Sequence, residues 1–202
     1  MNSDTVHDDI SYLRKLAESG RSGPILGGIF LAAAGIIFGA ASILDFAAMR
    51  GLFPVRGSEL WLGASGVFTL IWLVLFFRMR CTGTAASPSQ TNATFAAIWM
   101  ACAPGVLVAF GTTVLIAHQS NNLAILSAYV PVIYAFYGTA WFASAALARR
   151  SWMFLAALGS FVFAFVIALF SNSEYESLAM AGGLLLLLTL PGLKLAKDEA
   201  RP

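Results

Sequence analysis

The chain has 202 residues, of which 59% are hydrophobic and only 11% are charged, and its formal net charge is +2. Soluble domains carry about a quarter charged residues, so a water-exposed surface with this composition would contain large apolar patches. The composition therefore excludes an ordinary soluble domain, and the small net charge argues against a nucleic-acid partner.

Residues 1–21 form a polar segment ahead of the first apolar run. Apolar residues recur there at helical spacing, at Ile10, Leu13, Leu16 and Ala17. The acidic start at residues 1–9 disagrees with a signal peptide, which needs a basic one. We interpret Val6–Ser19 as a short amphipathic helix on the cytosolic face, with a frayed tail as the alternative. Residues 1–20 are the candidate surface for a cytosolic or membrane protein partner.

Six apolar segments follow. They are Pro24–Met49, Leu60–Phe77, Ala93–Ala117, Leu123–Ala148, Ser151–Phe170 and approximately Leu178–Leu195. Each is close to the ~20 residues that a helix needs to cross a bilayer. Strands are excluded because the runs lack two-residue alternation and are about twice the length of a barrel strand. The sequence predicts an all-α integral membrane bundle of six helices over residues 22–196, followed by a cytosolic tail at 197–202.

The basic residues predict the orientation of these helices. With a cytosolic N-terminus, ten basic residues lie on the cytosolic side: Arg14, Lys15, Arg21, Arg78, Arg80, Arg149, Arg150, Lys194, Lys197 and Arg201. Only Arg50 and Arg56 lie on the other side. This asymmetry is typical of the positive-inside rule and predicts that both termini are cytosolic.

Residues that carry catalysis or bind metal are scarce in the six segments. No charged residue lies deep within any of them, and Asp45 is about one turn from the outer end of the first. We interpret Asp45 as an interfacial carboxylate, with a gate or ion site as the alternative. His7 and His118 are predicted on opposite faces of the membrane, so they cannot ligate one haem or zinc ion. The sequence therefore predicts no catalytic residue, cofactor or metal.

A polar and aromatic stripe runs along the fourth segment. Tyr134, Tyr137, Trp141 and Ser144 are spaced by three, four and three residues, which places them on one helix face. Hydroxyl groups that face lipid would lack hydrogen-bond partners, so this face points into the bundle or into a cavity. We interpret it as interhelical packing; a pocket for a flat or apolar ligand is the alternative.

Small residues and one proline shape the packing of the segments. Gly35 and Gly39 form a GxxxG pattern in the first segment, and Ala179 with Gly183 is a weaker pair in the sixth. Such pairs allow close helix approach, either within the chain or between copies in a homo-oligomer. Pro104 lies midway along the third segment and is expected to kink or locally unwind it.

Three short stretches carry a resemblance. DISYLRKLAESGR, then GPILGG, and LPGLKL at the end of the last segment resemble small multi-pass inner-membrane proteins of bacteria without an assigned function. The resemblance implies six helices and a bacterial cytoplasmic membrane, and it carries over no catalytic or binding residue.

From these observations we expect a non-enzymatic regulatory, sensory or assembly component of the membrane. The alternative is a small permease or channel for a neutral or apolar solute. Its path would lie near Pro104 and the face of Tyr134, Tyr137 and Trp141.

Overall fold

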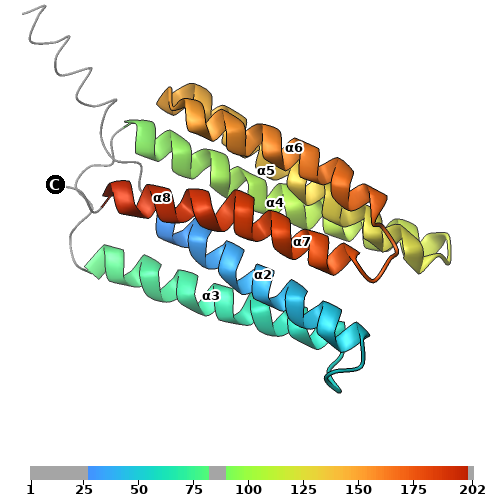
Figure 1. The fold of residues 1–202 in the computed structure, drawn as a ribbon. Coiled ribbons are helices and arrows are strands. Elements are labelled where there is room, and N and C mark those ends of the chain that lie inside the picture. The colour runs from blue at the N-terminus through green and yellow to red at the C-terminus, as the bar shows by residue number, and fades with distance from the viewer. Residues whose placement is uncertain (1–26, 82–89, 200–202) are drawn as a thin grey trace, which may run out of the picture.

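The computed structural model describes residues 27–81 and 90–199, which form helices joined by turns (Figure 1). In this part of the chain, six helices are long and apolar enough to cross a membrane, which confirms the all-α prediction. The amphipathic segment expected at residues 1–21 lies outside the described residues. Residues 197–199 of the expected cytosolic tail lie in the last turn of a helix.

The helices follow the six predicted segments closely. In chain order they are α2 (Gly28–Met49), α3 (Gly57–Cys81), α4 (Gln90–Gln119), the short 3₁₀-helix η1 (Leu123–Ala128) leading into α5 (Tyr129–Ala148), α6 (Ser151–Leu169), α7 (Glu176–Leu184), the π-helical turn η2 (Leu185–Thr189) and α8 (Leu190–Glu199). The last three are continuous and occupy the place of the sixth segment. We call them the α7–η2–α8 segment.

Residues with a left-handed backbone make the tight turns. Asn121 (φ 50°) follows α4 and Asn172 (φ 62°) follows α6, and asparagine tolerates this conformation better than most residues. Arg149 (φ 52°) ends α5 in the same conformation, and α6 starts two residues later. The two arginines therefore form the almost loop-free connection that the sequence indicates.

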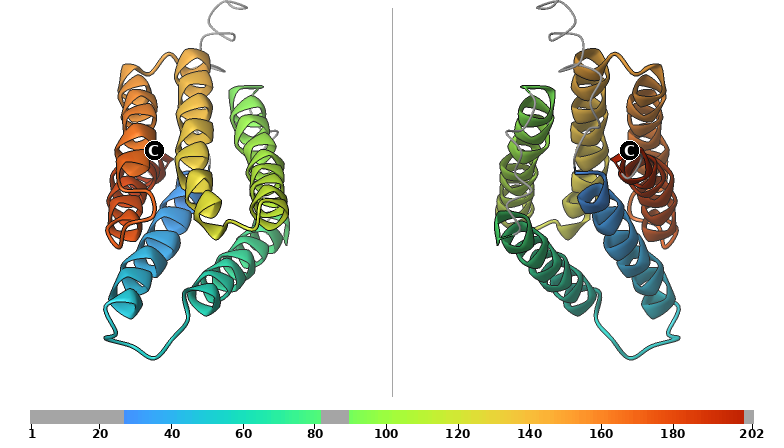
Figure 2. Two further views of the ribbon diagram at one scale, coloured as in Figure 1. Left: turned by 90° about the vertical axis from the view of Figure 1, so that its right-hand side faces the viewer. Right: turned by 90° about the vertical axis from the view of Figure 1, so that its left-hand side faces the viewer.

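The helices lie in two layers (Figures 1 and 2). One layer contains α4, α5 and α6, and the other contains α3, α2 and the α7–η2–α8 segment. α5 and α2 are the middle members of their layers. Each central helix therefore has neighbours on both sides within its layer.

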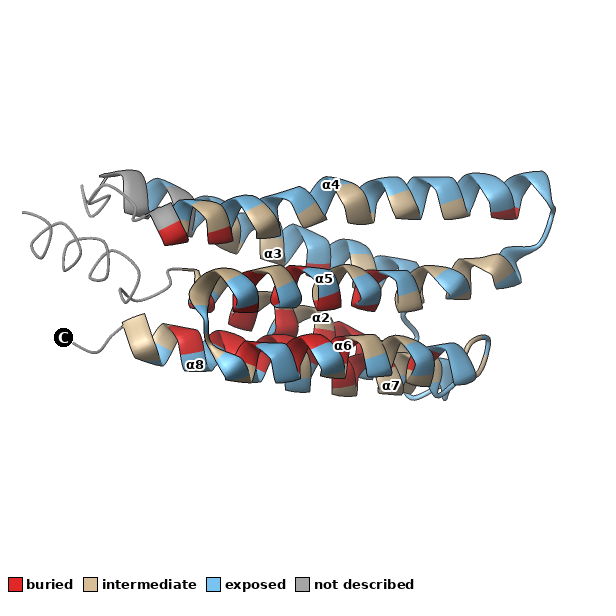
Figure 3. Cartoon of the chain, turned by 90° about the horizontal axis from the view of Figure 1, so that it is seen from above, coloured by how far each residue is buried: buried red, intermediate tan, exposed pale blue. Residues whose placement is uncertain are grey.

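The core is unevenly distributed among the helices (Figure 3). Buried residues concentrate in α2, α5, α6 and α7–η2–α8, and half of the last apolar window is buried. The corresponding windows of α3 and α4 are each only 6% buried. Four helices therefore make the packed core, and α3 and α4 attach to its side.

The irregular helix is not the predicted one. α4 continues without interruption through Pro104, so the local unwinding expected there is not seen. The irregularity lies instead in the α7–η2–α8 segment, where η2 adopts π-helical geometry directly before Pro191. The amide of Leu190 donates to the carbonyl of Leu185, five residues back, as a π-turn requires.

The two ends of the bundle differ in charge. The end where α2 begins and α8 finishes carries Arg78, Arg80, Arg149, Arg150, Lys194 and Lys197 with Asp198 and Glu199, a formal sum of +4. The opposite end carries Arg50 and Arg56 with Asp45, Glu59, Glu174 and Glu176, a formal sum of −2. We call these the basic end and the acidic end of the described bundle.

Candidate functional site

The polar and aromatic stripe lies on α5 and faces the centre of the bundle. Tyr134, Trp141 and Ser144 have no exposed surface, and Tyr137 is partly buried. α5 packs between α6 and α4 within its layer. The stripe therefore points across to the second layer.

Two side chains of the stripe bind the main chain of the opposite layer. The Tyr134 hydroxyl donates to the carbonyl of Met180 at 2.6 Å, and Trp141 Nε1 donates to the carbonyl of Leu187 at 3.0 Å. Both pairs have the same sequence separation, so α5 and the α7–η2–α8 segment run parallel and in register over two turns. The polar atoms of the stripe serve helix packing at both positions.

The Leu187 carbonyl accepts the indole donor at a place where its regular α-helical donor is missing. In a regular α-helix it would accept from the amide of residue 191, which is a proline and has no N–H. A bare carbonyl in an apolar core is costly, and Trp141 supplies the missing donor. The proline was visible in the sequence, but nothing there placed Trp141 beside the carbonyl that it frees.

Gly183 makes room for the Tyr134 ring. A Cβ added at Gly183 would lie 2.6 Å from Tyr134 and 2.8 Å from Phe163 of α6. Any larger residue would displace the ring that carries the hydroxyl donor. The small residue at position 183 therefore permits the contact between the two layers.

The GxxxG face of α2 packs against η2 within the same chain. A Cβ at Gly35 would collide with the Thr189 hydroxyl, and one at Gly39 would lie 3.2 Å from the Leu185 side chain. The structure thus places both predicted glycines at an intramolecular contact. Ala179, the partner of Gly183 in the weaker pair, is partly buried one turn away on the same side of α7, towards α6.

A second close approach of α2 was not predicted. A Cβ at Gly192 would lie 2.8 Å from the carbonyl oxygen of Gly28, so the two backbones nearly touch. The Gly28 amide also donates to Glu199 Oε1 at 2.9 Å. This contact joins the start of α2 to the end of α8 at the basic end.

Two buried polar atoms near the stripe have no hydrogen-bond partner among the described residues. They are Trp99 Nε1 on α4 and Ser144 Oγ on α5. The Trp99 ring packs edge-on against Trp141, with 5.1 Å between centroids, and lies 6.2 Å from Tyr137. Trp99 therefore extends the aromatic cluster of the stripe into α4, which the sequence did not indicate.

The structure does not bring Pro104 to the stripe. Pro104 is exposed on α4, whereas Cys102 and Gly105 face α5. A Cβ at Gly105 would lie 2.8 Å from the ring of Phe136. Pro104 and the stripe of α5 were both expected to line the path of a permease, but Pro104 lies on the side of α4 that faces away from the stripe.

Charged and polar side chains join α2 to α7 at the acidic end. Arg50 binds both carboxylate oxygens of Glu174 at 2.7 Å and donates to the Tyr175 hydroxyl at 3.2 Å. Asp45 Oδ2 accepts from the Ser177 hydroxyl at 2.6 Å. Asp45 is therefore engaged in a helix-to-helix contact near the end of the bundle.

Metal ligands do not gather in the described part of the chain. No group of three or more His, Cys, Asp or Glu side chains in residues 27–81 and 90–199 is placed to hold an ion. His118 is exposed at the acidic end, and His7 lies outside the described residues.

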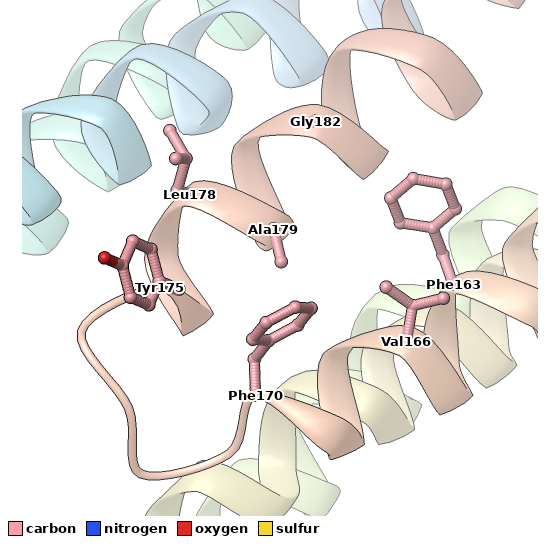
Figure 4. A pocket seen from close by; sticks show the side chains of 7 residues that line it. All are labelled: Phe163, Val166, Phe170, Tyr175, Leu178, Ala179 and Gly182. Atoms are coloured by element: carbon pink, nitrogen blue, oxygen red, sulfur yellow. The ribbon is translucent and has the colours of Figure 1, made fainter.

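An apolar groove separates α6 from α7 near the acidic end (Figure 4). α6 contributes Phe163 and Val166 to one wall, and Phe170, directly after α6, extends it. Leu178, Ala179 and Gly182 of α7 form the other wall, and Tyr175 lies where α7 begins. Its volume is about 360 Å³. The groove could not be predicted from the sequence, because its walls come from two different helices.

No protein-family model matches the chain, and neither curated proteins nor solved structures show a match to it.

Proposed function

We propose that this chain is an integral protein of a bacterial cytoplasmic membrane that crosses the bilayer six times with both termini in the cytosol. Six long apolar helices and the charge difference between the two ends support this proposal. Six basic residues at the basic end against two at the acidic end correspond to a cytosolic basic end. The bacterial location rests on the resemblance of the three sequence stretches.

Within the membrane, we assign the chain a non-enzymatic role as a regulatory, sensory or assembly component. The observation that carries this proposal is the use of the core polar groups. Tyr134 and Trp141 hold two helices together and have no exposed surface. In a core of this kind the donors stabilise packing and are not directed at a substrate.

The exposed helix α3 is the proposed contact surface for a membrane partner, including a second copy of this chain. Gly63 and Gly66 lie on it with nothing within 4 Å of an added Cβ, and Ser65 is exposed beside them. Small residues of this kind let a neighbouring helix approach closely. Residues 1–20 remain the proposed cytosolic contact, and the lipid bilayer itself is the remaining partner.

Cysteine labelling tests the topology. With Cys81 and Cys102 replaced by serine, we expect Ser120→Cys at the acidic end to react with an impermeant maleimide in intact spheroplasts. Lys197→Cys at the basic end should react only after the membrane is opened. The opposite pattern, or a protein recovered without detergent, would overturn the membrane proposal.

Photo-crosslinking tests the role. A benzophenone amino acid at Leu62, which is 74% exposed on α3, should give a discrete protein adduct in membranes. The matched control is Leu155, which is 71% exposed on α6 and should give lipid adducts alone. A band at twice the monomer mass identifies a second copy. Equal adduct patterns at the two positions would contradict a partner on α3.

The permease alternative has less support from the described residues. Its path would need the stripe to face a solute, but Tyr134 and Trp141 are bonded to the opposite layer, and Pro104 faces elsewhere. Labelling of Ser144→Cys by a water-soluble maleimide in the native protein would favour the permease over the regulatory, sensory or assembly role, since this labelling requires water to reach the core.

A further inference from the structure

The groove between α6 and α7 is a stretch in which two helices that otherwise pack closely leave space between them. Farther from the acidic end, the same helices meet tightly: a Cβ at Gly159 would lie 2.6 Å from Leu187. One at Gly183 would meet Tyr134 and Phe163. The adjacent Gly182 has nothing within 4 Å of an added Cβ, although it lines the groove. The space is therefore specific to one stretch of the two helices.

The groove opens onto an apolar surface. Phe165 and Leu169 on α6 are 77% and 84% exposed, and Leu178 on α7 is 43% exposed. An apolar space with few polar partners does not hold ordered water well. In the bilayer position proposed above, hydrocarbon surrounds this surface and is the natural content of the groove.

The shape of the groove suits a lipid chain. Its two walls come from neighbouring helices and are apolar, and a single acyl chain is thinner than a helix and can lie between them, beside Ala179 and Gly182 (Figure 4).

The charges at the mouth indicate the headgroup. Glu174 and Glu176 flank Tyr175, which lines the groove. With Arg50 bound to Glu174 and to the Tyr175 hydroxyl, the formal sum of these charges at the mouth is −2 plus 1, or −1. An acidic mouth attracts an ammonium group and repels an anionic headgroup. A primary ammonium also offers three donors to the carboxylate oxygens.

The distance between these carboxylates and the far end of the groove suits one lipid molecule. Gly182 lies six residues after Glu176, so the groove extends about 9 Å along the helix from the level of the carboxylates. A lipid with its headgroup at the mouth would place the upper part of one chain in this stretch.

We propose that the groove between α6 and α7 binds one acyl chain of a phosphatidylethanolamine molecule, with its ammonium group at the acidic mouth. This inference rests on the proposed membrane location, because it requires the groove to face lipid.

Photolabelling in nanodiscs tests the proposal. The full-length protein is inserted into phosphatidylglycerol nanodiscs that contain a small fraction of phosphatidylethanolamine with a diazirine on one acyl chain. Peptide mapping should find label on Phe163, Val166 and Leu178 well above that on Leu155, which is more exposed but lies outside the groove. Diazirine-labelled phosphatidylglycerol should label the groove about fivefold less, the effect of one exposed ion pair.

A matched pair of variants tests occupancy. Gly182→Leu fills the groove where an added side chain has open space, and it should lower groove labelling about tenfold by displacing two methylene groups. Gly63→Leu, equally open on α3, should leave that labelling unchanged. Even labelling of all exposed faces, or full labelling of Gly182→Leu, would refute the site. Equal labelling by both lipids would refute the headgroup preference. Failure to enter nanodiscs would instead refute the membrane proposal.

Discussion

Replacing Trp141 with phenylalanine tests the central contact of this fold. The substitution keeps an aromatic ring on α5 but removes the Nε1 donor that binds the Leu187 carbonyl at 3.0 Å. Because Pro191 has no N–H, that carbonyl then lacks both the indole donor and the amide donor that a regular α-helix would give it.

The expected cost has two parts. Hydrogen bonds between membrane helices average about 0.6 kcal/mol and reach about 1.7 kcal/mol, the small mean reflecting partners that are found elsewhere after disruption. Pro191 removes the usual alternative donor, so we expect a value near the upper limit, about 1.5 kcal/mol. The smaller ring also loosens packing against Trp99 and Trp152, whose centroids lie 5.1 and 6.0 Å from Trp141. That loss adds about 1 kcal/mol.

A double-mutant cycle separates the two parts. In Pro191→Ala the amide of residue 191 becomes a donor for the Leu187 carbonyl, so Trp141→Phe should then cost only its packing loss. We expect a coupling free energy of about 1 kcal/mol or more between the two substitutions. The measurement is unfolding by SDS in mixed micelles, followed by near-ultraviolet circular dichroism. A coupling below about 0.3 kcal/mol, within the error of additivity, would refute the reasoning.

The remaining predictions use the same unfolding assay. Gly183→Val should lower the free energy of unfolding by about 1–3 kcal/mol because it displaces the Tyr134 ring, whereas Gly182→Val should change it by less than about 0.5 kcal/mol. Equal effects of the two substitutions would contradict the packing of Tyr134 against Gly183. Ser144→Ala should stabilise by about 1 kcal/mol, since its buried hydroxyl has no described partner, and a loss of stability would reveal one. Arg50→Gln should cost at most about 1 kcal/mol, because the ion pair is 45% and 43% exposed, and the cost should shrink as salt is added; a salt-independent cost would point to packing.

Some site residues were predictable because periodicity alone defines a helix face. Tyr134, Tyr137, Trp141 and Ser144 share a face at any position in any bundle, and hydroxyl groups on that face need partners away from lipid. The structure supplies those partners for Tyr134 and Trp141. It supplies none for Ser144 among the described residues. Periodicity specifies the helix face on which a residue lies, but not the atom that its side chain contacts.

The two prolines show the limit of local reasoning. Pro104 and Pro191 each remove one amide donor from a helix, and we expected the distortion at Pro104 because it lies midway along its segment. The helix around Pro104 is continuous, and the π-helical turn lies before Pro191. In that turn Thr189 packs against Gly35, and Trp141 reaches Leu187 from α5. The location of the irregular turn thus coincides with contacts from two other helices.

The sequence by itself determined that this chain forms long apolar helices, where they lie in the chain to within a few residues, and how positive charge is divided between their ends. These properties depend on composition and spacing along one helix at a time, and each main-chain amide finds its partner within that helix. Only the tertiary structure decided that the Tyr134 ring packs against Gly183 whereas Gly182 borders an open groove, although the two glycines are neighbours in the chain. The reason is geometric, because a helix turns about 100° per residue and neighbouring positions meet different surroundings.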